Sequence, residues 1–256
     1  MPTGLTSRIS ALITPRRVPE LSRQGILQRA IDRLNARRYL EIGVDDGSLF
    51  RAIDVHERIG VDPIPAAENV VSACRKRGTA YFELPSDEFF AKEAPRTLAN
   101  GVDVVFVDGL HTFDQAYRDC IHALEYLSAG GLLLVHDCLP TSEAEAVAAD
   151  NYAAASALNV PGWSGDWTGD VWKTIVRLRA EHHDLETVVF DCEHGMAAVR
   201  RAPNTSGLTL SNQAVRALTY ADLCASPQSL LGLRPAGELL ELIDRMPPMR
   251  RGSWWR

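Results

Sequence analysis

Residues 38–48 have the sequence RYLEIGVDDGS, in which a short β-prone run stops at Gly43 and a glycine-containing turn follows. The next segment, residues 49–55, is apolar at helical spacing. This order predicts a strand, a tight turn and a helix. Glycine in such a turn lets the backbone approach a bound ligand closely, although a turn that serves only tight packing of strand against helix is the plainer interpretation.

The same alternation continues on both sides of this stretch. Before it, a helix with one buried stripe is predicted over residues 21–35. After it, strands are predicted over 58–63, 79–84, 102–109 and 132–137, with helices between them over 66–77, 86–94 and 113–127, the last ended by Gly130-Gly131. Strands that alternate with helices in this way form a doubly wound parallel sheet, which binds ligands at the carboxyl ends of its strands.

The remainder of the chain has a looser pattern. A helix is predicted over residues 171–181, β-prone runs at 186–190 and 196–200 complete the sheet as an antiparallel edge pair, and further helices are predicted over 211–218 and 236–245. We therefore predict an α/β fold with a Rossmann-like, doubly wound, mainly parallel sheet over residues 38–201 and an antiparallel C-terminal edge. Residues 1–37 and 202–256 are expected to form helical N- and C-terminal extensions.

Composition argues against several classes of protein. The 256 residues carry a formal net charge of -6, so the chain lacks the basic excess of a nucleic-acid-binding protein. Five cysteines, an odd number without a CxxC pair, argue against a disulfide framework and indicate a cytoplasmic protein. The longest apolar stretch near the start, residues 9–14, is too short to span a bilayer. We expect neither nucleic acid nor a membrane as a partner.

A second signal supports a ligand at the glycine turn. Asp62 ends the next predicted strand, 19 residues after Gly43, where a carboxylate can accept both ribose hydroxyls of an adenosine moiety. The pattern resembles the class I S-adenosylmethionine-dependent methyltransferases, whose first motif is an acidic residue followed by Gly-x-Gly-x-Gly. This chain keeps Glu41, Gly43 and Gly47, and has Asp45 in place of the middle glycine. The Gly-x-Gly-x-x-Gly spacing typical of NAD-binding proteins is absent.

This resemblance implies that S-adenosylmethionine is the cofactor. Ser86-Asp87, after the third strand, matches the place where the family contacts the adenine, while an N-cap by Ser86 is an equally good structural account. The full set of cofactor-binding residues that the resemblance implies is Glu41, Gly43, Asp45, Gly47, Ser48, Asp62, Ser86, Asp87, Asp108, Gly109 and His111.

Two further stretches, FVDGLHTF at 106–113 and GGLLLVHD at 130–137, narrow the resemblance. They are similar to the metal-dependent group of sugar, macrolide and polysaccharide O-methyltransferases, the Methyltransferase 24-like group. In its metal-dependent members, acidic residues at the ends of the fourth and fifth strands hold magnesium, and the corresponding residues here are Asp108, His136 and Asp137. The similarity extends over roughly residues 38–200, and it also implies a homodimer.

The predicted chemistry follows from these strand ends. Adjacent parallel strands end side by side, so Asp108 and Asp137 face one cleft, and two carboxylates suit magnesium, which would orient a substrate hydroxyl and lower its pKa. His136 or His111 would accept the hydroxyl proton, and we favour His136. Two alternatives remain open: the histidines hydrogen-bond the backbone and no metal binds, or manganese replaces magnesium because nitrogen is a poor magnesium ligand.

A tryptophan-rich segment follows the fifth strand. We predict that Trp163, Trp167 and Asp170 bind the substrate from an exposed, glycine-containing loop, because aromatic faces stack on sugars or planar acceptors and carboxylates bind hydroxyls. Trp172 is predicted to be the first core residue of the following helix.

These residues lead to a functional hypothesis. Residues 38–201 would form an S-adenosylmethionine-binding domain that catalyses magnesium-assisted O-methylation of a saccharide or glycosylated metabolite, such as the precursor of a methylmannose-type polysaccharide. The substrate would be a small molecule or an oligosaccharide. One alternative is a small aromatic or catechol-type O-methyltransferase, and another is a cofactor-binding relative without methyl transfer.

Overall fold

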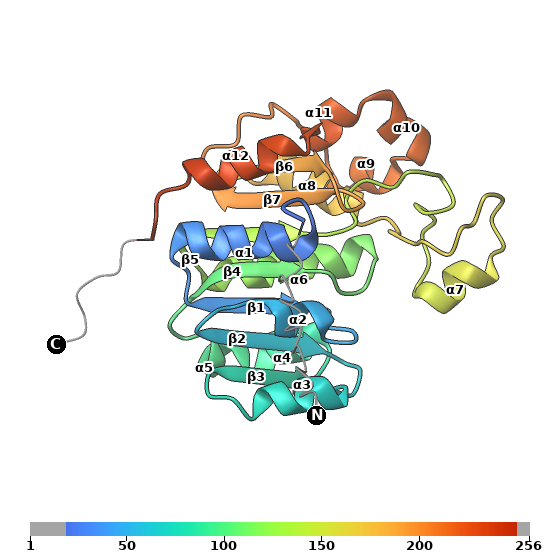
Figure 1. The fold of residues 1–256 in the computed structure, drawn as a ribbon. Helices are drawn as coiled ribbons and strands as arrows, with labels where there is room; N and C mark the ends of the chain where they lie inside the picture. The colour runs from blue at the N-terminus through green and yellow to red at the C-terminus, as the bar shows by residue number, and fades with distance from the viewer. Residues whose placement is uncertain (1–18, 250–256) are drawn as a thin grey trace, which may run out of the picture.

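The computed structural model describes residues 19–249 (Figure 1). The strands are β1 (Arg38–Ile42), β2 (Glu57–Asp62), β3 (Thr79–Glu83), β4 (Val102–Val107), β5 (Leu127–Val135), β6 (Leu185–Asp191), β7 (Met196–Arg201) and β8 (Arg234–Pro235). The helices are α1 (Arg23–Leu34), α2 (Ser48–Ala52), α3 (Glu68–Cys74), α4 (Ser86–Lys92), α5 (Ala94–Thr97), α6 (Phe113–Tyr126), α7 (Tyr152–Ala157), α8 (Trp172–Glu181), α9 (Asn212–Ala217), α10 (Tyr220–Ala225), α11 (Pro227–Leu231) and α12 (Gly237–Arg245). Over this part of the chain, no helix has the length and apolar character needed to cross a membrane.

All strands belong to one sheet in the order β3-β2-β1-β4-β5-β7-β6-β8. β1 to β5 pair in parallel, and β7 pairs antiparallel with both β5 and β6. The predicted doubly wound sheet with an antiparallel C-terminal part is therefore confirmed. β8 lies outside β6 as the edge strand, and its two residues are too few for a sequence pattern to indicate. The chain order reverses between β1 and β4, which is where doubly wound sheets bind ligands.

Helices cover both faces of the sheet, and this explains the continuous apolar runs of its strands. Phe106 and Leu134 point to the face covered by α1, α2 and α12. Their chain neighbours Val105 and Leu133 point to the opposite face, covered by α4, α6 and α8. Because successive strand residues point to opposite faces, both residues of each pair are buried.

The extensions pack onto this sheet. α1 is capped by Ser22, whose hydroxyl accepts a hydrogen bond from the backbone N–H of Gly25 at 3.1 Å, and it ends at Asn35 in a left-handed conformation. α12 lies beside α1 (Figure 1), and Arg29 binds Asp244 through two N–H groups at 2.9 and 2.6 Å. The boundaries 1–37, 38–201 and 202–256 remain predictions, and residues 1–18 and 250–256 of these extensions lie outside the described residues.

The prediction that Gly130-Gly131 ends the sixth helix is wrong. α6 ends at Tyr126, β5 begins at Leu127, and both glycines lie inside the strand, where the pairing of β4 with β5 shifts register. Gly130 has φ +82°, and a Cβ on Gly131 would lie 2.7 Å from the carbonyl oxygen of Asp103. The glycines therefore serve a strand irregularity: Gly130 takes left-handed backbone, and Gly131 leaves room for the backbone of Asp103.

Candidate active site

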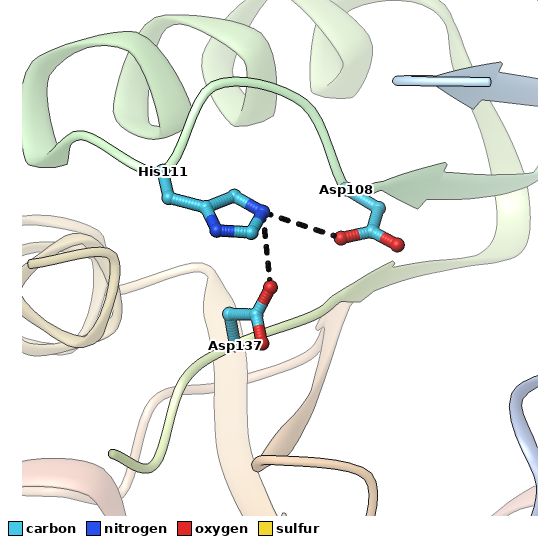
Figure 2. A group of neighbouring side chains, drawn as sticks. All are labelled: Asp108, His111 and Asp137. Atoms are coloured by element: carbon cyan, nitrogen blue, oxygen red, sulfur yellow. Dashed lines mark ion pairs between the residues drawn. The ribbon is translucent and has the colours of Figure 1, made fainter. Parts of the chain in front are cut away.

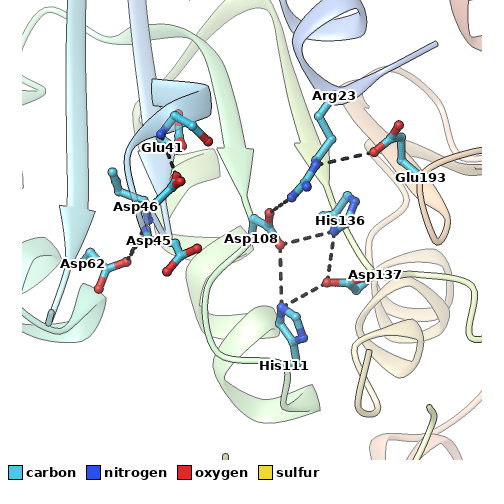
Figure 3. A network of polar contacts seen from close by, with 12 residues as sticks. Arg23, Glu41, Asp45, Asp46, Asp62, Asp108, His111, His136, Asp137 and Glu193 are labelled. Atoms are coloured by element: carbon cyan, nitrogen blue, oxygen red, sulfur yellow. Dashed lines mark hydrogen bonds and ion pairs between the residues drawn. The ribbon is translucent and has the colours of Figure 1, made fainter. Parts of the chain in front are cut away.

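A cavity of about 1250 Å³ opens at the carboxyl ends of β1, β2, β4 and β5. Its wall also includes the start of α1, the hairpin between β6 and β7, and part of the long connection from β5 to α8. The polar side chains at these strand ends lie close together in Figure 3. The site thus occupies the switch point where the topology predicts a ligand.

The turn after β1 is built on left-handed backbone. Gly43 has φ +85°, and a Cβ there would lie 2.0 Å from the carbonyl oxygen of Asp108; a Cβ on Gly47, at φ +71°, would lie 2.0 Å from Val70 Cγ2. Asp45, in the place of the middle glycine, has φ +48°. Aspartate tolerates this region better than most residues, so the departure from the glycine pattern keeps the same backbone path.

Gly43→Ala is expected to lower the free energy of unfolding by more than about 2 kcal/mol, because left-handed backbone costs an L-residue about 1–2 kcal/mol and the Asp108 contact adds to that. Gly130→Ala is the matched control, since its φ is similar and nothing lies within 4 Å of its Cβ. Urea unfolding of both variants measures the difference. If both variants lose the same free energy of unfolding, the contact of the added Cβ at Gly43 with Asp108 has no energetic cost.

Asp62 organises the turn from the end of β2. Its Oδ2 accepts the backbone N–H groups of Val44 at 2.8 Å and Asp45 at 3.0 Å, and its Oδ1 accepts that of Ile64 at 2.8 Å. The side chain lines the cavity, as a ribose-binding carboxylate must. Asp62 therefore has a structural role that the spacing of the motif did not indicate.

Glu41 is almost fully buried beneath the turn and lines the cavity. Its Oε2 accepts the phenol hydrogen of Tyr39 at 2.6 Å. Burial raises the pKa of Glu41 to about 8, and the negative charge of Asp108 acts in the same direction. At neutral pH this predicted cofactor residue is therefore mainly an uncharged acid.

The raised pKa of Glu41 predicts a pH-dependent stability. Between its ordinary pKa of 4.5 and about 8, the folded state holds a proton that the unfolded state has released, so this group lowers the free energy of unfolding as pH rises through that window. Glu41→Gln keeps an oxygen for Tyr39 and removes the titration. Relative to wild type, the variant should gain on the order of a few kcal/mol between about pH 5 and pH 8. Parallel stability curves in urea unfolding would contradict this.

Polar residues at another part of the cavity only partly match the predicted adenine contacts. Ser86 is buried, lines the cavity and accepts a hydrogen bond from Gln115 at 3.0 Å, whereas Asp87 does not line the cavity and pairs with Arg118 at 3.1 Å. The N-cap account of Ser86 is wrong, because α4 begins at Ser86 itself. Asp119, which no sequence motif indicated, is buried in the cavity wall. Burial raises the pKa of Asp119 to about 6.

Two carboxylates and two imidazoles meet at the ends of β4 and β5 (Figure 3), and Figure 2 shows Asp108, His111 and Asp137 from close by. His111 Nε2 lies 3.6 Å from Asp108 Oδ1 and 3.0 Å from Asp137 Oδ2. His136 Nδ1 lies 3.3 and 3.0 Å from the same two oxygens. Burial raises the pKa of Asp108, but the hydrogen bonds and positive charges of the two histidines outweigh it and hold this pKa well below its usual range.

The two histidines differ in what their ring nitrogens can do. His111 Nδ1 lies 2.6 Å from the carbonyl oxygen of Trp167, which can only accept, so Nδ1 carries a hydrogen. Burial lowers the pKa of His111, but Asp108, Asp137 and the Trp167 carbonyl outweigh burial and raise it. His136 is only 6% exposed; its Nδ1 lies within 3.3 Å of an oxygen of each carboxylate, and its Nε2 has no hydrogen-bond partner among the described residues. Burial lowers the pKa of His136, but Asp108 and Asp137 outweigh burial and raise it to about 10, so the ring is charged at neutral pH. The geometry favours His111 as proton acceptor, where the sequence had favoured His136.

The donor set fits a divalent cation. One ligand atom each from Asp108, His111 and Asp137 lies within 4.8 Å of the others, among residues 19–249. Two carboxylate oxygens suit magnesium, and the added imidazole nitrogen also admits manganese. The metal ligands predicted from the sequence were Asp108, His136 and Asp137, whereas the cluster in the structure has His111 in place of His136. Asp137 has φ +58°, a conformation that costs energy and is common at functional sites.

The tryptophan segment differs from its prediction. Trp172 lies in the core, as expected. Trp167 is 8% exposed, so the prediction that it stands on an exposed loop is wrong: its indole N–H binds the carbonyl of Val147 at 2.8 Å, and its ring packs on His111. Trp163 is half-buried, its ring contacts Tyr152, and it does not line the cavity.

Asp170 has a structural partner instead of a place in the cavity. Its Oδ1 accepts the backbone N–H of Phe113 at 2.7 Å, at the first residue of α6. This contact places a negative charge at the N-terminus of that helix, which stabilises it. A substrate contact for Asp170 remains only a prediction.

Three polar residues of the cavity wall come from segments in which the sequence predicted no site residue: Arg23, Glu193 and His194. Arg23 comes from α1, and the other two come from the β6–β7 hairpin, where both have positive φ. The hairpin is fixed to the chain after β5, since Cys138 and Leu139 donate to carbonyls of this hairpin at 3.0 and 2.8 Å. These segments are remote from the motifs in sequence, so no local pattern placed them in the site.

Comparisons with known proteins match this region. Residues 40–138, from β1 to just past Asp137, match the model of a family described as a methyltransferase domain. A candidate caffeoyl-CoA O-methyltransferase from Staphylococcus aureus has the same fold, with 13% identity, a TM-score of 0.52, and coverage of 70% of this chain and 82% of that chain. A candidate O-methyltransferase from Klebsiella pneumoniae is 16% identical, with a TM-score of 0.50 and coverage of 76% and 94%. No curated protein matches the chain.

Proposed function

We propose that this chain, whose residues 40–138 form a class I S-adenosylmethionine-dependent methyltransferase domain, methylates a hydroxyl of a saccharide or glycosylated metabolite. The observation that carries the proposal is the Asp108–His111–Asp137 cluster, which lies in the same cavity as the glycine turn and Asp62. A cofactor site and a group that can accept a hydroxyl proton thus share one cavity.

The cavity fits the cofactor. S-adenosylmethionine supplies an activated methyl group on its sulfonium. Asp62 would accept the ribose hydroxyls, Gly43 lets the turn pack directly against Asp108 in the cavity wall, and Ser86 and Asp119 offer polar groups to the adenine. The volume exceeds what a drug-sized ligand needs, so an acceptor has room beside the cofactor.

His111 would act on the acceptor. Trp167 fixes its orientation and keeps a hydrogen on Nδ1, so in the neutral ring Nε2 is the nitrogen that would take the hydroxyl proton. Asp108 and Asp137 would stabilise the charge that the imidazole gains. Holding the hydroxyl in line with the methyl group supplies most of the remaining rate enhancement.

Asp108 and Asp137 would also hold a divalent cation. When bound, such an ion would lower the pKa of the acceptor hydroxyl and orient it. Magnesium prefers oxygen ligands, so with this ion the carboxylates bind and His111 remains available for the proton. EDTA is therefore expected to slow turnover, and added magnesium to restore it.

A polyhydroxylated acceptor is supported by the carboxylate of Asp166, which lines the cavity and can accept its hydroxyl hydrogens. The second candidate is an aromatic or catechol acceptor. Leu110 and Tyr152 favour it, because they line the same cavity and are 42% and 53% exposed. Both classes present neighbouring hydroxyls to the cluster.

The test begins with calorimetric titration of the protein with S-adenosylhomocysteine. Absence of binding would remove the proposed function. If binding is found, turnover is scored on mono- and oligosaccharides and on catechols, each with magnesium and with EDTA. Turnover confined to catechols would select the second candidate, and binding without turnover on any acceptor would leave a cofactor-binding protein.

A further inference from the structure

Arg23 is the only arginine or lysine among the described residues that line the cavity; the other charged lining residues, apart from histidines, are aspartates and glutamates. The guanidinium comes from the first turn of α1, outside the segment that matches the methyltransferase family. It is bound on two sides, with Nη1 3.1 Å from Asp108 Oδ2 and Nε 3.5 Å from Glu193 Oε2. Nη2 has no hydrogen-bond partner within residues 19–249.

Asp108 separates two parts of the cavity. Its Oδ1 faces His111 and His136, and its Oδ2 faces Arg23. Figure 3 shows Arg23 and His111 on opposite sides of this carboxylate. The side with His111 belongs to the acceptor, so the side with Arg23 is left for another part of the bound molecules.

The three substituents of the cofactor's sulfonium must take three directions. The adenosyl group leads to Asp62, and the methyl group must face the acceptor at His111 and Asp137. The remaining substituent is the amino acid tail, which ends in a carboxylate, and the cavity wall left for it is the one with Arg23. A carboxylate in a cavity of carboxylates is destabilised unless a cation pairs with it, and arginine suits carboxylates by its planar fork.

We propose that Arg23 binds the carboxylate of the cofactor's amino acid tail and so selects S-adenosylmethionine. This inference rests on the proposed function. Asp108 and Glu193 hold the guanidinium in place before the cofactor arrives, which reduces the entropy lost on binding. Nη2 provides the free N–H groups for the tail.

The experiment compares two ligands that differ only in this carboxylate, S-adenosylmethionine and decarboxylated S-adenosylmethionine, by calorimetric titration. Wild type should bind S-adenosylmethionine at least about tenfold more tightly. In Arg23→Ala this preference should vanish or reverse, because the decarboxylated ligand carries more positive charge and the remaining cavity is acidic. Arg29→Ala is the matched control on the same helix; its partner Asp244 lies outside the cavity, so the preference should be unchanged.

Other outcomes would overturn the inference. If Arg23→Ala weakens both ligands equally, Arg23 only fixes α1 to the site, and if it weakens neither, its partner is not the cofactor. Arg23→Lys provides a second variant should Arg23→Ala not fold. It keeps the positive charge but loses the planar fork, so the preference for S-adenosylmethionine should fall below that of wild type, and an unchanged preference counts against the proposal. If wild type binds neither ligand, the proposed function itself fails and this inference with it.

Discussion

His111→Ala is expected to lower kcat by about 10²–10⁴-fold, the usual contribution of a general base. The Kd for S-adenosylhomocysteine should change by less than about tenfold, which corresponds to about 1.4 kcal/mol. The large effect follows from the fixed ring: Trp167 holds Nδ1, and Nε2 faces both carboxylates and the cavity. Steady-state kinetics with a saturating acceptor, together with calorimetric titration, separates the two quantities.

His183→Ala is the control for this prediction, because His183 is an exposed histidine away from the cavity. It should leave both kcat and Kd unchanged. His136→Ala tests the competing assignment. If this variant loses turnover while His111→Ala keeps most of it, the proton acceptor is His136, as the sequence had favoured.

The second large effect is expected at Asp62. Asp62→Ala should raise the Kd for S-adenosylhomocysteine by about 100-fold or more, because hydrogen bonds to a charged group contribute about 1.5–3 kcal/mol and this carboxylate would accept two ribose hydroxyls. Part of the loss will come from the turn, since Val44 and Asp45 lose the acceptor of their N–H groups.

Asp62→Asn separates these contributions. The amide keeps one oxygen for Val44 and Asp45 and removes the charge and the second acceptor. An intermediate Kd with unchanged thermal stability would assign the remaining loss to the ribose. Wild-type affinity in both variants would contradict the role of Asp62 in cofactor binding.

Sequence patterns located those parts of the cavity wall whose residues are close together in the chain. The turn at residues 43–47 and the strand ends at Asp62, Asp108 and Asp137 were found because a strand, its terminal residue and the next helix are adjacent in the chain. The segment that contains these motifs, residues 40–138, matches the model of a methyltransferase domain, as the resemblance implied.

The sequence-based predictions failed where a contact with a residue distant in the chain decides the position and role of a side chain. Trp167 looked like an exposed loop residue, yet the carbonyl of Val147, 20 positions earlier, holds its indole in the wall of the site. Asp87 has the right place in the motif but pairs with Arg118, 31 positions away. Arg23 reaches Asp108 across 85 positions. Periodicity over a few turns of helix or strand contains no information on such contacts.

The pairing of α1 with α12 has a consequence for how the protein is made. Among the described residues, α1 is the first helix to leave the ribosome and α12 the last, and Arg29 and Asp244 are 215 positions apart. At about 5–20 residues per second, α1 waits roughly 10–40 s for this partner. During synthesis its apolar stripe, which includes Ile26 and Leu27, therefore lacks the cover that α12 gives the folded protein. The wall that Arg23 contributes to the cavity likewise waits for Glu193, its partner from the β6–β7 hairpin.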